Sequence, residues 1–163
     1  MNLFLTYRHF FTIIFTIISG SLLSQEMNTN DEPLSQQETH IAMHDFPKDM
    51  VINHIEGWGG MTVAVNEMPA GSDLGPLLEG LKNNSCQVPH WGYMIAGVLK
   101  LTYDDGREET LKAGDLFYMP PGHVGVVMED IKIMDFSPQK GMHDVIKHIE
   151  YKLAEFQKQD AKN

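Results

Sequence analysis

Several features that mark other protein classes are absent from this chain of 163 residues. Its one cysteine cannot form an internal disulfide, so no cystine framework holds the fold, and a CxxC zinc site is excluded. The patterns GxGxxG, GxxxxGKS/T, HExxH and GxSxG do not occur, which removes the commonest nucleotide-binding, zinc-protease and serine-hydrolase interpretations. Basic residues are few: 12 Lys and Arg stand against 22 Asp and Glu, and the net charge of -10 argues against non-specific binding to nucleic acid.

Most of the chain can nevertheless bury a hydrophobic core. Hydrophobic residues make up 42% of it and charged residues 21%, which is typical of a globular protein and not of a disordered tail. The length suits one domain of ordinary size and leaves little room for a second.

The N-terminal segment has the composition of a targeting signal. Residues 1–25 contain no acidic residue and one basic residue, Arg8, followed by an apolar run over 10–18 and then small residues. The run is shorter than the roughly 20 apolar residues that a membrane-spanning helix needs. We predict a signal peptide or membrane anchor here, and therefore an exported or membrane-attached protein; the alternative is a cytoplasmic protein whose true start is Met27. Residues 26–49 are polar and are predicted to form a linker or N-terminal arm.

Short strand-like runs separated by turn residues follow from Met50 onward. Residues 99–103 alternate in the period-2 pattern of a strand with one buried face, and Asp104-Asp105-Gly106 is a strong hairpin signal. The predicted strands are 51–55, 61–65, 90–100 with 99–103, 108–111, 116–119, and a last hairpin of 124–128 and 131–136 around Glu129-Asp130. Strands of this length at regular spacing favour an all-β sandwich or barrel of antiparallel sheet.

The tail of the chain has a different periodicity. Five apolar residues are spaced by four and three positions in turn: Met142, Ile146, Ile149, Leu153 and Phe156. This spacing predicts an amphipathic helix within 140–163, and the stripe is too short for a free coiled coil. We expect the helix to pack against its own barrel; contact with a second subunit is the alternative.

Glycines and prolines recur at fixed spacings between Cys86 and Pro138. Gly114, Pro120 and Gly122 form the pattern G-x5-P-x-G. Further marked segments are a glycine-closed strand at 93–97, a turn at 111–115, Pro-His-Trp-Gly-Tyr at 89–93 and Pro-Pro-Gly-His at 120–123. In this order they resemble the cupin family, and in particular a subgroup of small single-domain cupins. The resemblance implies an antiparallel, jelly-roll-like cupin β-barrel over 50–139, followed by the helix of 140–163.

The metal-ligand positions of that family are changed in this chain. The usual first motif is His-x-His-x3-Glu, and its glutamate position is occupied here by His90. With the spacing of this motif, Cys86 stands at the position of the second histidine and Asn84 at that of the first. In the second motif Gly125 replaces the histidine, and His123 lies two residues earlier. The three-His-one-Glu set of the family is therefore absent.

The residues that remain still suit a metal ion. Cys86 and His90 are separated by an even number of positions, so on a continuous strand they share a face. His123 follows a proline-glycine break, where a strand can re-enter the barrel with its side chain inward. A thiolate with two imidazoles suits zinc, iron or copper and leaves a coordination position for water or substrate. The alternatives are a small buried thiol, a core histidine and a turn histidine bonded to a backbone carbonyl.

The predicted function follows from the barrel and this residue set. We predict that Trp91, Tyr93, Tyr118 and Met119 line a ligand pocket, with Met94 and Met128 also inside the barrel. The resemblance implies a divalent metal, a small oxygenated ligand and activity of dioxygenase or isomerase type. A metal-free barrel that binds or senses a small anionic or sugar-like ligand is the alternative, so the sequence leaves open whether the protein is an enzyme. A third hypothesis is an assembly protein that acts as a homodimer. We expect membrane contact only through residues 1–25.

Overall fold

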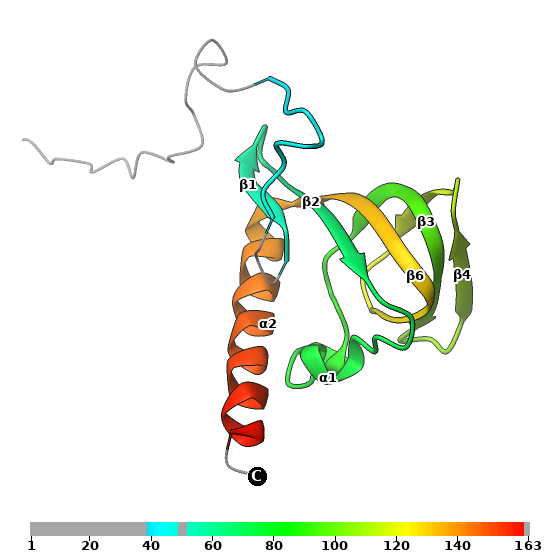
Figure 1. Cartoon of the computed structure of the whole chain (residues 1–163). Coiled ribbons are helices and arrows are strands. Elements are labelled where there is room, and N and C mark those ends of the chain that lie inside the picture. Colours follow the sequence, from blue (N-terminus) through cyan, green and yellow to red (C-terminus); the bar gives the residue numbers. More distant parts are fainter. Residues whose placement is uncertain (1–38, 49–51, 162–163) are drawn as a thin grey trace, which may run out of the picture.

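The computed structural model describes residues 39–48 and 52–161 and consists of a curled antiparallel sheet with a long helix beside it (Figure 1). The predicted signal segment and most of the predicted linker lie outside these residues. The strands are β1 (His54–Trp58), β2 (Met61–Met68), β3 (His90–Tyr103), β4 (Glu108–Lys112), β5 (Leu116–Met119) and β6 (His123–Pro138). The helices are α1 (Gly75–Leu78) and α2 (Gln139–Asp160), with a short 3-10 turn, η1 (Lys82–Asn84). In the part of the chain that is described, no helix has the length and apolar character needed to cross a membrane.

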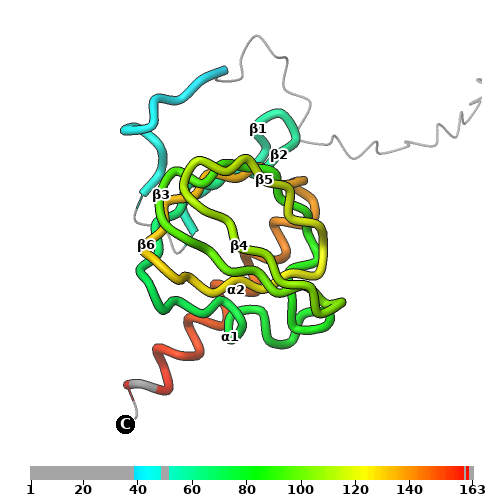
Figure 2. Tube along the Cα trace, turned by 90° about the vertical axis from the view of Figure 1, so that its right-hand side faces the viewer, coloured from blue at the N-terminus to red at the C-terminus, as the bar shows by residue number. Residues whose placement is uncertain are grey.

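The strands pair in the order β1-β2-β6-β3-β4, and β5 also pairs with β3. Every pair is antiparallel. One half of β6 lies between β2 and β3, and the other half continues along β3 to its end. The sheet therefore curls round a common centre without closing (Figure 2). The prediction of an antiparallel, barrel-like fold with a C-terminal helix is confirmed.

The hairpin predicted around Glu129-Asp130 is wrong, because β6 runs through this point without a turn. The pairing of β3 with β6 changes register around Gly97, as at a β-bulge. Gly97 has φ of +80°, and a Cβ there would collide with the carbonyl oxygen of Asp130. Bulges bend long strands and increase their twist. The chain thus changes direction by bending both strands, and Glu129-Asp130 lie exposed on the bend.

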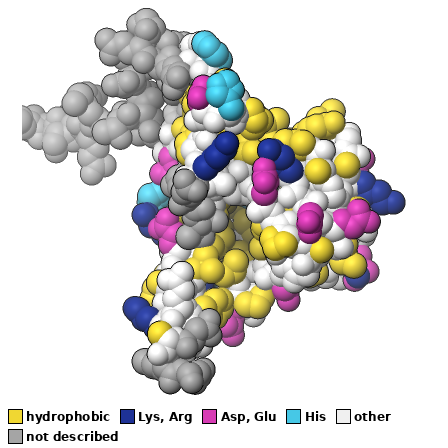
Figure 3. All heavy atoms as spheres, in the orientation of Figure 1, with side chains coloured by type: hydrophobic (Ala, Val, Ile, Leu, Met, Phe, Trp, Pro, Cys, Tyr) yellow, Lys and Arg dark blue, Asp and Glu magenta, His cyan; other side chains and the backbone are white. Residues whose placement is uncertain are grey.

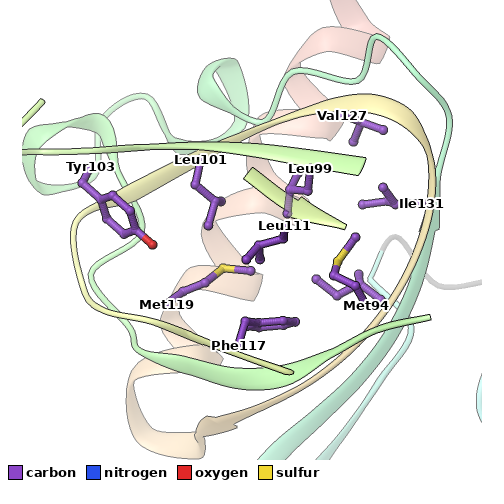
Figure 4. Close-up of a cluster of buried hydrophobic side chains, with 10 residues drawn as sticks. Met94, Leu99, Leu101, Tyr103, Leu111, Phe117, Met119, Val127 and Ile131 are labelled. Carbon is purple, nitrogen blue, oxygen red and sulfur yellow. The ribbon is translucent and has the colours of Figure 1, made fainter. Parts of the chain in front are cut away.

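The barrel core is built from alternate residues of its strands. Leu99, Leu101 and Tyr103 of β3 are buried, as the period-2 pattern predicts. Their side chains meet residues from the other strands inside the barrel (Figure 4). The whole cluster is Met94, Leu99, Leu101, Tyr103, Leu111, Phe117, Met119, Val127, Ile131 and Ile133. Met94 is inside as predicted, whereas Met128 is exposed and that prediction is wrong.

Helix α2 packs against its own barrel through the first half of its apolar stripe. Met142, Val145 and Ile146 are buried in a cluster with Leu78 of α1 and Cys86. This arrangement confirms the predicted amphipathic helix and its packing. The second half of the stripe is only half-buried and borders a cavity described below. The homodimer stays a prediction.

Candidate metal centre

Three side chains from different parts of the chain converge at one end of the barrel. Cys86 and His123 face each other in an isolated antiparallel bridge, where the Cys86 N–H donates to the His123 carbonyl at 2.9 Å. His90 is the first residue of β3, four positions after Cys86. Among residues 39–48 and 52–161, these are the one group of three His, Cys, Asp or Glu side chains close enough to share a metal ion. All three are buried, and their candidate ligand atoms lie within 4.8 Å of one another.

The distances within this group are close to those of a metal site. The sulfur of Cys86 lies 3.4 Å from Nε2 of His90. Two such atoms bound to one tetrahedral zinc ion would lie about 3.6 Å apart, given the usual Zn–S and Zn–N bond lengths. The His90 and His123 rings meet edge to face with their centroids 4.9 Å apart. Small side-chain movements would therefore be enough to place three ligand atoms round one ion.

Each histidine uses Nδ1 for the protein, which leaves Nε2 for a ligand. The Nδ1–H of His123 donates to the carbonyl of Pro120 at 2.7 Å, as in the predicted turn-histidine alternative. Nδ1 of His90 lies 2.5 Å from the hydroxyl oxygen of Ser137 and 3.5 Å from Oδ1 of Asp135. Metal-binding histidines typically donate their other ring N–H to a carbonyl or carboxylate in this way, which fixes the tautomer. Each histidine can therefore keep the hydrogen bond at Nδ1 while it binds a metal through Nε2.

The charges of the site also suit a metal. Burial raises the pKa of the Cys86 thiol, but hydrogen bonds from His123 and His90 outweigh burial and lower this pKa to about 6. Burial lowers the pKa of His90, but the Asp135 carboxylate and the Cys86 sulfur outweigh it and raise this pKa to about 10. Near neutral pH the metal-free pair is a thiolate beside an imidazolium. The thiolate is the form that binds metal, and His90 would release its proton on binding.

The remaining family positions supply no fourth protein ligand. Asn84 is exposed, and its side-chain oxygen accepts a hydrogen bond from the Gly80 N–H at 2.9 Å. Gly125 has no side chain to offer, and a Cβ there would lie only 3.1 Å from Cδ1 of Leu99. A set of one sulfur and two nitrogens with an open position fits zinc, iron or copper. The three residues present could therefore hold a divalent metal accessible to a small molecule.

A cavity of about 620 Å³ opens beside the three residues. Cys86, His90 and His123 form part of its wall, together with Met119 and Asp135. It runs from the barrel interior to the helices α1 and α2. Hydrophobic side chains gather in the hollow between α2 and the barrel (Figure 3). The volume lies within the range of typical small-molecule sites, about 300–1,000 Å³.

Three of the predicted pocket residues lie on the outer face of the barrel, so their placement is corrected. Trp91, Tyr93 and Tyr118 are 45%, 36% and 51% exposed and do not line the cavity. Trp91 and Tyr118 are cross-strand partners whose rings stack at 5.1 Å. The reason is the alternation of β-strands: His90 and Met119 are paired and point inward, so their neighbours point outward. Met119 does line the cavity.

Sequence reasoning missed Asp135 and Ser137, which hold His90. Both lie on β6, far along the chain from His90, and the Ser137 hydroxyl also donates to Oδ1 of Asp135 at 3.2 Å. Their spacing of two places them on one face of a strand. That pattern is common in surface strands, and only the pairing of β3 with β6 brings it to the histidine.

No protein-family model matches this chain, and no curated protein does. KdgF from Halomonas sp. is a similar solved structure, 18% identical over 63% of this chain and 94% of KdgF, with a TM-score of 0.47. A cupin-2 domain containing protein from Shewanella frigidimarina is also 18% identical, over 60% of this chain and 93% of that one, with a TM-score of 0.41. EutQ from Clostridium difficile is 16% identical over 54% of this chain and 68% of EutQ, with a TM-score of 0.40. Of these three solved structures, the Shewanella protein is the one named as a cupin.

Proposed function

We propose that this protein binds one divalent metal ion through Cys86, His90 and His123 and takes up a small oxygenated ligand in the adjoining cavity. The observation that carries the proposal is the convergence of one buried sulfur and two buried imidazoles at the wall of a cavity. Zinc, iron and copper all accept this set of atoms. A metal bound there would act as a Lewis acid toward an oxygen of the ligand.

The protein groups around the site have distinct tasks in this proposal. Pro120 and Ser137 hold the two imidazoles so that each presents Nε2. The Asp135 carboxylate lies at the cavity wall, accepts a hydrogen bond from Ser137 and places a negative charge beside the His90 imidazole. The apolar remainder of the wall limits water, which strengthens electrostatic interactions inside. A reaction of dioxygenase or isomerase type is the class that the sequence resemblance implies, and the open ligand position supports it.

A metal-free binding function is the second candidate. The Cys86 sulfur and His90 Nε2 are within hydrogen-bond distance of each other, so the pair is satisfied without an ion. The imidazolium of such a pair could contact an anionic head group in the cavity.

Metal content separates the two candidates. The full chain would be purified without added metal, analysed by mass spectrometry for metals, and titrated with zinc and cobalt. We expect about one metal per chain and a loss of at least about 100-fold in affinity for Cys86→Ala and for His90→Ala. His143→Ala is the matched control, because this histidine is exposed on α2 and pairs with Glu56. Less than about 0.1 metal per chain, with no gain on titration, would leave the metal-free function.

A further inference from the structure

The cavity extends well beyond the three metal-binding candidates. Met142 of α2 packs in one cluster with Cys86, and the apolar stripe of α2 continues from there to Phe156. At 1.5 Å rise per residue, this stripe is about 21 Å long. Its last part, from Ile149 through Leu153 to Phe156, spans about 10 Å and lines the cavity.

The two halves of the stripe differ in how deeply they are buried. Met142, Val145 and Ile146 are buried under the barrel. Leu153 and Phe156 are only half-buried, although both are apolar and face the cavity. Across from them, Leu74 and Leu77 of the α1 region form the other wall. We call the space between Leu74, Leu77, Ile149, Leu153 and Phe156 the tail groove.

The edge of the tail groove is held in place by polar contacts between α2 and the residue that follows α1. Lys152 Nζ lies 3.0 Å from Oε2 of Glu79, and His148 Nε2 lies 3.1 Å from the carbonyl of the same residue. The side chain of Lys152 is mostly covered, with 14% exposed. These contacts tie α2 to the end of α1 beside the groove.

Several polar atoms elsewhere on the cavity wall are already bonded to the protein. Oδ1 of Asn66 accepts from the Asn53 N–H at 2.9 Å, and the Ser72 hydroxyl donates to the Pro69 carbonyl at 2.7 Å. Oδ1 of Asp73 accepts from the Gly75 N–H at 2.9 Å. Most of the remaining wall is apolar, so a ligand rich in hydroxyl groups would lose bonds to water that these side chains cannot replace, which is costly. This arrangement argues against the sugar-like ligand considered from the sequence.

We infer that the ligand of this site is amphipathic: an oxygen-bearing chelating head beside Cys86, His90 and His123, and an apolar chain in the tail groove. The chelating head of this ligand rests on the proposed function. Its apolar chain is inferred separately, from the apolar face of α2. A head group alone would leave most of the 620 Å³ empty and the apolar wall against water. An apolar chain about 10 Å long covers Ile149 to Phe156.

The test uses three compounds that separate head from chain: acetohydroxamate, octanohydroxamate and octanamide. Their dissociation constants would be measured by calorimetry on the zinc-loaded full chain and on the metal-free chain. Each fully buried CH₂ adds about fourfold in affinity, so burial of half of the longer chain predicts octanohydroxamate to bind about 60-fold tighter than acetohydroxamate. Leu153→Asp should remove most of this gain and leave acetohydroxamate binding unchanged, which also shows that the variant is folded. Tyr151→Asp, on the exposed side of α2, is the matched control and should keep the full gain.

The outcomes separate this inference from the proposed function. Equal affinities of the two hydroxamates for the zinc-loaded protein would overturn the inference that the ligand has an apolar chain. The proposed metal site would be unaffected by that result. Preference for octanohydroxamate and octanamide over acetohydroxamate without any effect of zinc would support the tail groove and overturn the metal site. An unchanged preference in Leu153→Asp would overturn the assignment of the groove to this helix face.

Discussion

Nδ1 of His90 lies 2.5 Å from the hydroxyl oxygen of Ser137, and that hydroxyl in turn donates to Asp135 at 3.2 Å. The three groups form a chain of hydrogen bonds in which Ser137 accepts from the imidazole and donates to the carboxylate. Because Nδ1 is thereby engaged, Nε2 of His90 is directed at Cys86, 3.4 Å away. A fully buried serine thus sets the orientation of a candidate metal ligand from the opposite strand.

We predict that Ser137→Ala lowers zinc affinity by about tenfold, because partners that orient a ligating histidine contribute about 10- to 100-fold. The loss should be modest, since Asp135 remains 3.5 Å from the imidazole and can accept its proton directly. Competition with a chromophoric chelator measures the change. Ser72→Ala is the control, because this hydroxyl bonds to the Pro69 carbonyl in a different loop. An affinity equal to wild type would show that Ser137 does not orient the histidine.

The thiol of Cys86 provides a pH-dependent prediction for the metal-free protein. Its pKa is lowered to about 6, because hydrogen bonds from His123 and His90 outweigh the raising effect of burial. The thiolate should therefore form with a midpoint near pH 6 and be about nine-tenths formed at pH 7, as followed by ultraviolet thiolate absorbance. In His90→Gln one hydrogen bond and one positive charge are lost, so the midpoint should move upward. A wild-type midpoint above about pH 8, the range of an ordinary cysteine, would contradict the thiolate–imidazolium pair.

The bend of β3 and β6 predicts unequal costs for two glycine substitutions. Gly97→Ala combines a positive φ of +80° with a Cβ that collides with the Asp130 carbonyl. Gly114 also has a positive φ, +97°, but no atom lies within 4 Å of a Cβ placed there. We expect Gly114→Ala to lower the free energy of unfolding by about 1 kcal/mol, the cost of the backbone conformation alone. Gly97→Ala should cost at least about 2 kcal/mol more, from overpacking, as measured by urea denaturation. Equal costs would show that the bulge can relax.

Much of the fold could be predicted because its signals are local. The turn glycines, the Asp-Gly hairpin and the period-2 burial of Leu99, Leu101 and Tyr103 each act within a few residues. The continuity of β6 was not predictable in this way. Glu129-Asp130 has the composition of a turn, and only the bulge opposite Gly97 allows both strands to bend together.

The three side chains that converge at the candidate site could be predicted, but the groups that hold them could not. Cys86, His90 and His123 stand at or near family positions, and the structure brings them within 4.8 Å. Asp135 and Ser137 could not be identified, because their role depends on strand pairing across 47 residues. The outward direction of Trp91 could have been predicted from its neighbour: because successive side chains of a strand point to opposite faces, an inward His90 places Trp91 outward.

That alternation leads to a prediction about neighbouring residues of β5. Tyr118 is half exposed on the outer face, whereas Met119 is buried against the barrel core and lines the cavity. Tyr118→Ala removes only the stacking with Trp91, so we expect the free energy of unfolding to fall by about 1 kcal/mol and zinc affinity to stay unchanged. Met119→Ala leaves a hole in the core and should cost about 2–5 kcal/mol. Chemical denaturation and zinc titration of both variants test the assignment. If Tyr118→Ala weakened zinc binding and Met119→Ala were harmless, the inward and outward faces of this strand would have to be exchanged.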